Sequence, residues 1–185
     1  MRTVRFRRIP RPRAFLQALA VFLCLCMAGC LASGRKYNVA FSPKGDSLDL
    51  VLSAVSAAEQ SILVAAYSFT SKPVAQALLE ASKRGVSVRV VADKKSNSGR
   101  YTAVTFLANR GVPVRLNGHY AIHHHKFMVI DGRHVQTGSF NYSAAAVNKN
   151  AENVLLIRDA PELAGRYAAE WQRLWEEGVP LEARY

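Results

Sequence analysis

Polar side chains between residues 123 and 153 include the types needed for chemistry at a phosphate group. His124 and Lys126 are separated by one residue, so on an extended strand both side chains lie on the same face. An imidazole can act as a nucleophile or an acid, and a fixed ammonium group neutralises charge on phosphate oxygens. The pair therefore predicts a catalytic phosphate site.

Downstream residues add donors and a carboxylate to this candidate site. Ser139 and Asn141 follow the second strand of an expected hairpin, where a hydroxyl and an amide can donate to the same phosphate. Ser139 could instead serve only to satisfy a turn. Glu152 begins the next expected strand, where its carboxylate can accept a hydrogen bond from a histidine ring and set its tautomer.

The run His123, His124, His125 raises the question of a metal site. Neighbouring positions on a strand point to opposite faces, so the three rings cannot converge on one ion. No carboxylate stands nearby at a metal-ligand spacing. The sequence therefore predicts no metal and no other cofactor.

A basic loop follows one of the expected strands. The segment DKKSNSGR contains Lys94, Lys95 and Arg100. Ligands bind at the carboxyl ends of strands in α/β sheets, so this loop is expected either to contact the substrate backbone or to be ordinary solvated surface.

Short apolar runs alternate with helical patterns along the rest of the chain. Strands are expected over 37–41, 61–68, 86–92, 112–116, 121–130, 134–137 and 154–158. Helices are expected over about 46–59, from Ser71 and Pro73 to Gly85, over about 98–109, and from near Pro161.

Two further patterns shape the expected fold. Asp131-Gly132 lies between two strands and is a strong two-residue hairpin signal. The last helix aligns a stripe expected to face the core, formed by Leu163, Tyr167, Trp171, Leu174 and Trp175. Alternating strands and helices predict one α/β sandwich domain over 37–185, with a mixed, mostly parallel central sheet.

The composition limits the classes of partner. The chain has 185 residues, of which 50% are hydrophobic and 21% charged, as in a globular protein rather than a disordered, fibrous or polytopic membrane protein. Its net charge is +12, and six arginines lie in the first 34 residues, which contain no acid. The remainder keeps a net charge of +6, which favours a polyanionic partner such as nucleic acid or an anionic membrane surface.

Residues 1–34 are typical of an export signal. Arginines precede an apolar run over 14–31, and small residues follow where a signal peptidase could cut. The same run could be an uncleaved membrane anchor, and Met27-Ala28-Gly29-Cys30 resembles a lipobox that would lipidate Cys30. Each interpretation places residues 37–185 outside the cytoplasm of a bacterial host, in the periplasm, secreted or tethered to a membrane.

The motif His124-x-Lys126-x₄-Asp131-x₆-Gly138-Ser139 resembles the HKD motif of the phospholipase D superfamily. The stretch HHKFMVIDGRHVQTGSFNYSAAAVNKNAENVLLI is similar to its small bacterial endonuclease branch in particular. The likeness also includes AYSFT, KRGVSVRVV and the last helix, so it covers nearly all of 37–185. It implies a phospholipase D-like α/β/α sandwich.

The resemblance also implies a mechanism. His124 would attack phosphorus to form a phosphohistidine, a second motif's histidine would protonate the leaving alkoxide, and water would then release the product. Lysines and amides, here Lys126 and Asn141, would stabilise charge without a metal ion. Glu152 matches the carboxylate that orients the nucleophile, and Asp131 is expected to be structural because of its place at the hairpin turn.

This chain carries one motif where larger relatives carry two, and Gly138 is a structural part of that motif. The resemblance therefore implies a homodimer with the active site at its two-fold interface. The favoured function is an exported phosphodiesterase that cleaves DNA or RNA without sequence specificity. Phospholipase D-type hydrolysis of phospholipid head groups is one alternative. An inactive nucleic-acid-binding or DNA-uptake protein is another, although the intact motif argues against it.

Overall fold

A computed structural model describes residues 36–99 and 102–183. They form a sheet with the strand order β1-β7-β6-β5-β2-β3-β4-β8. The strands are β1 (Tyr37–Ser42), β2 (Ser61–Ala66), β3 (Ser87–Asp93), β4 (Val114–Asn117), β5 (Lys126–Ile130), β6 (His134–Gly138), β7 (Glu152–Ile157) and β8 (Val179–Pro180). The helices are α2 (Ser47–Ser56), α3 (Lys72–Lys83), α4 (Ala103–Ala108), α5 (Ala144–Asn148) and α6 (Pro161–Glu177).

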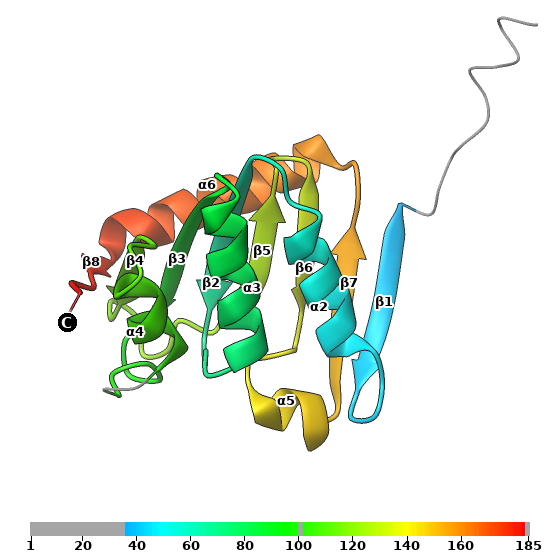
Figure 1. The fold of residues 1–185 in the computed structure, drawn as a ribbon, viewed down its shortest axis with the longest axis horizontal. Coiled ribbons are helices and arrows are strands. Elements are labelled where there is room, and N and C mark those ends of the chain that lie inside the picture. The colour runs from blue at the N-terminus through cyan, green and yellow to red at the C-terminus, as the bar shows by residue number, and fades with distance from the viewer. Residues whose placement is uncertain (1–35, 100–101, 184–185) are drawn as a thin grey trace, which may run out of the picture. The chain divides into compact units, whose positions relative to one another are not determined.

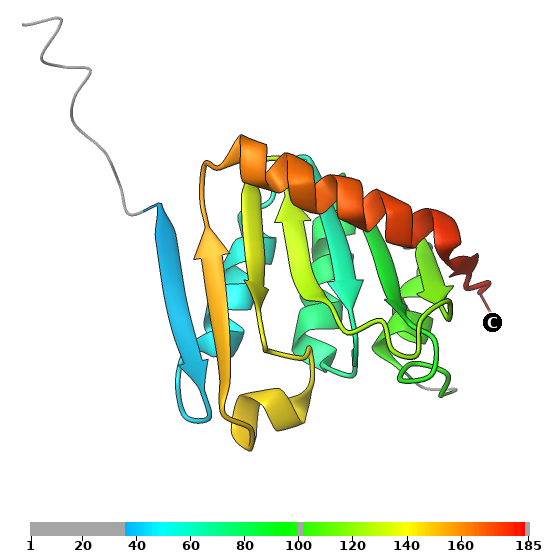
Figure 2. The same cartoon turned by 180° about the vertical axis from the view of Figure 1, so that it is seen from behind.

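Helices cover both faces of this sheet. α2, α3 and α4 lie on one face, and α6 crosses the strands on the other (Figures 1 and 2). The short helix α5 lies at one end of the sheet, in the connection from β6 to β7. The predicted α/β/α sandwich with a mixed sheet is confirmed.

The expectation of a mostly parallel sheet is wrong. Only the β2–β3 and β3–β4 pairs are parallel, and the other pairs of neighbouring strands run antiparallel. A parallel pair needs a long crossover, and α3 and α4 supply the only such helical crossovers between neighbouring strands in the described chain. From β5 onward the chain returns through a tight turn and then the α5 connection, which makes these pairs antiparallel.

The strand before the hairpin also begins later than predicted. β5 starts at Lys126, and the three histidines lie in an irregular segment ahead of it. The backbone N–H of His123 donates to the Asp93 carboxylate at 2.9 Å instead of to a neighbouring strand, which holds this segment across the end of β3. The strand-alternation argument for the histidines therefore does not apply.

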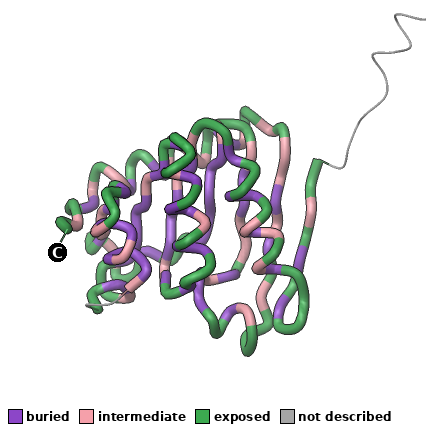
Figure 3. Tube along the Cα trace, in the orientation of Figure 1, coloured by how far each residue is buried: buried purple, intermediate pink, exposed green. Residues whose placement is uncertain are grey.

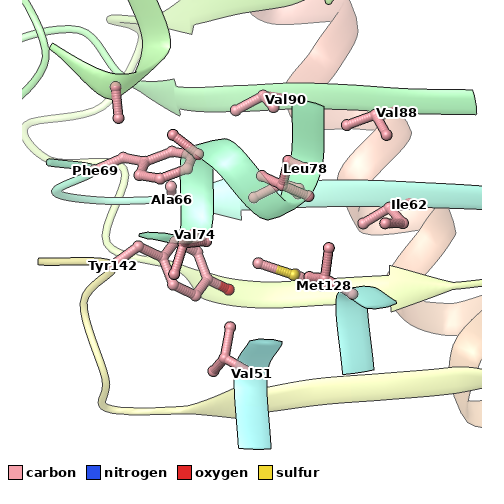
Figure 4. Close-up of a cluster of buried hydrophobic side chains, with 14 of the residues drawn as sticks. Val51, Ile62, Ala66, Phe69, Val74, Leu78, Val88, Val90, Met128 and Tyr142 are labelled. Carbon is pink, nitrogen blue, oxygen red and sulfur yellow. The ribbon is translucent and has the colours of Figure 1, made fainter. Parts of the chain in front are cut away.

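Apolar side chains fill both layers between sheet and helices. Figure 4 shows the larger cluster, in which Val51 of α2 and Leu78 of α3 lie over Ile62 and Met128 of the sheet. On the other face, Trp171 of α6 is buried, and its Nε1 donates to the Val64 carbonyl at 2.8 Å. The predicted stripe on the last helix packs in this second cluster, which confirms its place in the core.

Burial is greatest in the central strands and falls at the sheet edge (Figure 3). The outer strand β1 keeps Tyr37, Val39 and Phe41 exposed, because α6 lies over other strands. Among the described residues, no helix has the length and apolar character to span a membrane. The predicted export signal over 1–34 lies outside the described residues, so its alternatives stay predictions.

Candidate active site

Opposite strand directions bring the candidate residues to one end of the sheet. Lys126 is the first residue of β5, Gly138 is the last of β6, and Glu152 is the first of β7. β2 ends beside them, since Ala66 pairs with Lys126. Residues far apart in the sequence therefore lie together at one end of the strands, where β2 and β3 also end.

The His124 and Lys126 side chains meet at Tyr67, which follows β2. The rings of His124 and Tyr67 have centroids 4.7 Å apart, and Lys126 Nζ lies 5.1 Å from the Tyr67 ring centroid. Lys126 Nζ also donates to the His124 carbonyl oxygen at 2.6 Å. Tyr67 and this hydrogen bond therefore place the ammonium group and the imidazole side by side.

Lys126 is nearly buried, whereas His124 is exposed. Burial lowers the pKa of Lys126 below its ordinary value, and the negative charge of Glu152 acts in the opposite direction. A buried ammonium interacts more strongly with an anion than an exposed one does, because less water screens its charge. This site can therefore hold a phosphate oxygen on Lys126 next to an accessible imidazole.

Ser139 and Glu152 form a hydrogen-bonded pair beside this centre. Ser139 Oγ donates to Glu152 Oε2 at 2.6 Å, and the Asn150 side chain donates to Oε1 at 3.0 Å. The backbone N–H of Asn153 donates to Ser139 Oγ at 3.1 Å. Among the described residues no hydrogen bond joins Glu152 to His124, so the predicted orienting role of Glu152 stays a prediction.

Asn141 lies where β2 and the β6–β7 connection approach one another. Its Oδ1 accepts a long contact of 3.5 Å from the backbone N–H of Ser68. Because the amide oxygen faces the protein backbone, the amide nitrogen is the group available to donate to a phosphate.

The rings of His123 and His125 lie against one another. Their ring centroids are 5.6 Å apart, and His123 is buried while His125 is exposed. Burial, and then the charge of His125, lower the pKa of His123 to about 4, so His123 is neutral at physiological pH. In the described part of the chain, no group of three or more His, Cys, Asp or Glu side chains is arranged to hold a metal ion.

The basic loop begins at the same end of the strands. Lys94 and Lys95 follow β3 and are exposed, and Lys95 Nζ donates to the Ala121 carbonyl at 3.4 Å. The loop is thus tied to the segment that carries His124. Arg100 lies outside the described residues, and contact between this loop and a substrate stays a prediction.

Sequence reasoning missed the residues that hold the site loops together. Asp93 accepts the backbone N–H groups of His123 and Ser96, at 2.9 and 2.7 Å. The buried Asn97 donates to the carbonyls of Tyr67 and Asp93, at 2.6 and 2.8 Å. The sequence signal for these contacts is a polar run that directly follows a strand.

The two residues expected to be structural make contacts that suit this role. The Asp131 carboxylate accepts backbone N–H groups of Glu59, Gln60 and Ser61, at distances from 2.7 to 3.2 Å. Burial acts to raise the pKa of Asp131, but these hydrogen bonds hold it below its ordinary value. Gly138 has a φ of +146°, and a Cβ there would lie 2.2 Å from the Asn153 carbonyl oxygen.

Comparison with known proteins identifies the family. A family model described as cardiolipin synthase, phospholipase D-like domain, matches residues 51–175, more than half of the chain. The chain belongs to the phospholipase D superfamily. This superfamily member is therefore related to hydrolases of the phospholipase D type.

The structure is similar to that of Nuc from Salmonella typhimurium, a phospholipase D family member. The identity is 40% and the TM-score 0.78, over 80% of this chain and 98% of Nuc. Phospholipase D from Rickettsia conorii is 34% identical over 75% of this chain and 69% of its own length. The mitochondrial cardiolipin hydrolase of Danio rerio is 34% identical over 86% of this chain and 72% of its own length.

Proposed function

We propose that this phospholipase D-superfamily hydrolase is a phosphodiesterase that cleaves nucleic acid without sequence specificity. The observation that carries the proposal is the exposed His124 imidazole held beside the buried Lys126 ammonium, with Tyr67 in contact with both. The arrangement offers a nucleophile and a fixed positive charge to the same phosphodiester. The predicted export signal over 1–34 supports action outside the cytoplasm.

The reaction has two displacements at phosphorus. A His124 ring nitrogen forms a bond to phosphorus while the bond to the leaving alkoxide breaks, and a second histidine gives that alkoxide a proton. Water then attacks phosphorus and passes its proton to the second histidine, and the phosphorus–nitrogen bond breaks. His124 and the acid are thereby restored.

The other residues stabilise charge and position the nucleophile in this scheme. Lys126 and the amide nitrogen of Asn141 neutralise the phosphate oxygens as negative charge develops. The Ser139–Glu152 pair orients a histidine ring through the carboxylate. This donor set supplies positive charge without a metal ion, so we propose that the reaction is metal-independent.

The second histidine requires a partner copy of the chain. In-line displacement needs the nucleophile and the acid on opposite sides of phosphorus, so one histidine cannot serve as both at once. We propose a homodimer in which a second His124 supplies the acid. Ile122, two residues before His124, is 49% exposed, which suits a surface that a partner subunit covers.

Positive charge supports nucleic acid as the substrate, because phosphate contacts provide most of the non-specific affinity for polynucleotides. Phospholipid head groups are the second candidate. The names of relatives favour them, since these include phospholipase D and mitochondrial cardiolipin hydrolase. Both substrates present a phosphodiester to the same residues.

One experiment separates these substrates. The purified protein is incubated in excess EDTA with plasmid DNA, with RNA and with phosphatidylcholine vesicles. We expect cleavage of the polynucleotides. Choline release with intact polynucleotides would transfer the assignment to phospholipid, and binding without turnover of any substrate would indicate the inactive protein. Complete loss of cleavage in EDTA, restored by Mg²⁺ or Zn²⁺, would contradict metal independence.

A further inference from the structure

A groove lined by residues of β5, β6 and α6 extends the site. It lies on the face of the sheet that α6 crosses, and Figure 2 shows the course of this helix. The groove has a volume of about 570 Å³ and begins at the motif residues His124 and Lys126. The strand side of the groove also includes His125, Phe127, Thr137 and Gly138, and the helix side is formed by Leu163, Arg166, Tyr167 and Glu170. The groove is therefore continuous with the catalytic centre.

The helical side presents a single face of α6. Its four residues are spaced at intervals of three, one and three, which places them on one side of an α-helix. Leu163 and Tyr167 pack into the core beneath, and the Tyr167 ring meets Phe127 edge-on with centroids 4.9 Å apart. Arg166 and Glu170 are thus the charged groups that α6 brings to the groove.

These two charged groups differ in their partners. Glu170 is paired with Arg173 at 2.6 Å and lies 3.5 Å from His125 Nε2, so the Arg173 guanidinium compensates its negative charge. Arg166 is exposed, and in the part of the chain that the structure describes no carboxylate pairs with it. An uncompensated guanidinium thus stands in the groove that leads to His124.

We propose that Arg166 binds the phosphate next to the scissile one in a polynucleotide that lies along this groove. The proposal rests on the proposed function, because it takes His124 and Lys126 as the site of the scissile phosphate. A guanidinium suits this role, since its planar donors bind phosphate oxygens in pairs. A head group with a single phosphodiester has no second phosphate for Arg166, so this residue favours a polymer over such a lipid.

The test compares two substrates that differ by one neighbouring phosphate, the thymidine dinucleotide TpT and the trinucleotide TpTpT. The measured quantity is kcat/KM for TpTpT divided by kcat/KM for TpT. Arg166→Ala should lower this ratio about fivefold, as expected for the loss of one solvent-exposed ionic contact. Arg166→Lys should lose less, because it keeps the charge.

Arg133→Ala is the matched control. It also removes an arginine, but from the turn at the opposite end of β5 and β6, and its ratio should equal that of the wild type. An unchanged ratio in Arg166→Ala overturns the proposal. If the ratio is unchanged because kcat/KM falls equally on both substrates, Arg166 acts in the reaction itself.

Equilibrium binding separates this proposal from the proposed function. In the His124→Ala background, Arg166→Ala should reduce the slope of log K against log salt for oligothymidine by about 0.7, the value for one contact on a single strand. This reduction supports the groove even if the wild type cleaves no nucleic acid, a result that would refute only the proposed function. An unchanged slope, or hydrolysis of phosphatidylcholine vesicles lowered by Arg166→Ala, overturns the inference.

Discussion

Lys126 shows how the surroundings of a single residue prepare it for the proposed catalysis. Lys126 is 7% exposed, and its ammonium donates to the His124 carbonyl and lies near the Tyr67 ring. Because burial lowers its pKa, Lys126 loses its proton at a lower pH than a solvated lysine does. The alkaline limb of the activity profile should therefore report on this residue.

Replacement of the nucleophile is the first prediction. His124→Ala should abolish turnover, because no other described imidazole contacts the Tyr67 ring beside Lys126. Folding and DNA binding should stay nearly intact, since His124 is exposed. Turnover is measured on plasmid DNA, with His119→Ala as the control that retains activity. A phosphohistidine trapped at another position would contradict the assignment.

Glu152 supplies the second prediction. Glu152→Gln should lower kcat by orders of magnitude if the carboxylate controls a histidine tautomer. It also removes the charge that raises the pKa of Lys126, so the alkaline limb of kcat/KM should move to lower pH. The pH profile is measured for both proteins. Ser139→Ala is the control and should leave the alkaline limb in place, because it keeps the Glu152 charge. A near-normal kcat in Glu152→Gln would refute the orienting role of Glu152.

At the scale of elements, the β5–β6 hairpin and its connection to β2 place the motif. Asp131 and Gly132 both have positive φ, as the central residues of a type I′ turn require. The Asp131 carboxylate then caps the backbone that leads into β2. The turn thus determines which residues of β5 and β6 lie together at the end of the strands that holds the candidate site.

The third prediction concerns this cap. Asp131→Asn replaces a carboxylate that accepts three N–H groups and should cost about 1 kcal/mol, which lowers Tm by about 3 °C. The pKa of Asp131 is lowered in the folded state, so its stabilisation is present above the ordinary carboxyl pKa and is lost as the pH falls through the folded value. Thermal unfolding at several pH values measures this. Asp46→Asn, at a carboxylate without a cap hydrogen bond, should leave Tm unchanged.

The loop after β3 supplies the fourth prediction. If Lys94 and Lys95 contact phosphates, their double alanine variant should bind duplex DNA with a shallower slope of log K against log salt, by about 0.9 for each lost contact. Binding is measured by fluorescence anisotropy over a range of salt concentrations. Lys44→Ala provides a control at a loop outside the candidate site, and an unchanged slope in the double variant would show that the loop is ordinary surface.

At the scale of the whole molecule, one chain provides half of the proposed machinery. Among the described residues, His124 is the histidine whose ring contacts Tyr67 and whose carbonyl accepts from Lys126. A symmetric pair is the simplest way to supply a second imidazole, because the same surface patch then serves both subunits.

The fifth prediction follows from that symmetry. Light scattering should give about twice the chain mass, as for a C₂ dimer. Wild-type subunits mixed with His124→Ala subunits should form heterodimers with one working histidine and far less than half the activity of the wild-type dimer. Ile122→Glu should weaken association and activity together. A fully active monomer would refute the dimer and would require His119 or His134 as the acid.

The sequence alone determined the features that depend on local spacing. The motif residues, the hairpin signal and the apolar stripe on α6 were all readable, because turns and amphipathic faces follow from neighbouring residues. The late start of β5 was not readable. Apolar and polar residues before Lys126 fit a strand, but the long-range hydrogen bond from His123 to Asp93 holds them in a loop.

Only the tertiary structure decided what surrounds the motif. Strand directions and order depend on which connections contain a crossover helix, and these placed Lys126, Gly138 and Glu152 at one edge in a mostly antiparallel sheet. The Tyr67 contact and the Arg166 groove join segments distant in the sequence, and no local pattern encodes such meetings. The sequence thus determined which candidate catalytic residues this protein carries, and the packing of α6 and of the strand ends decided which groove they face.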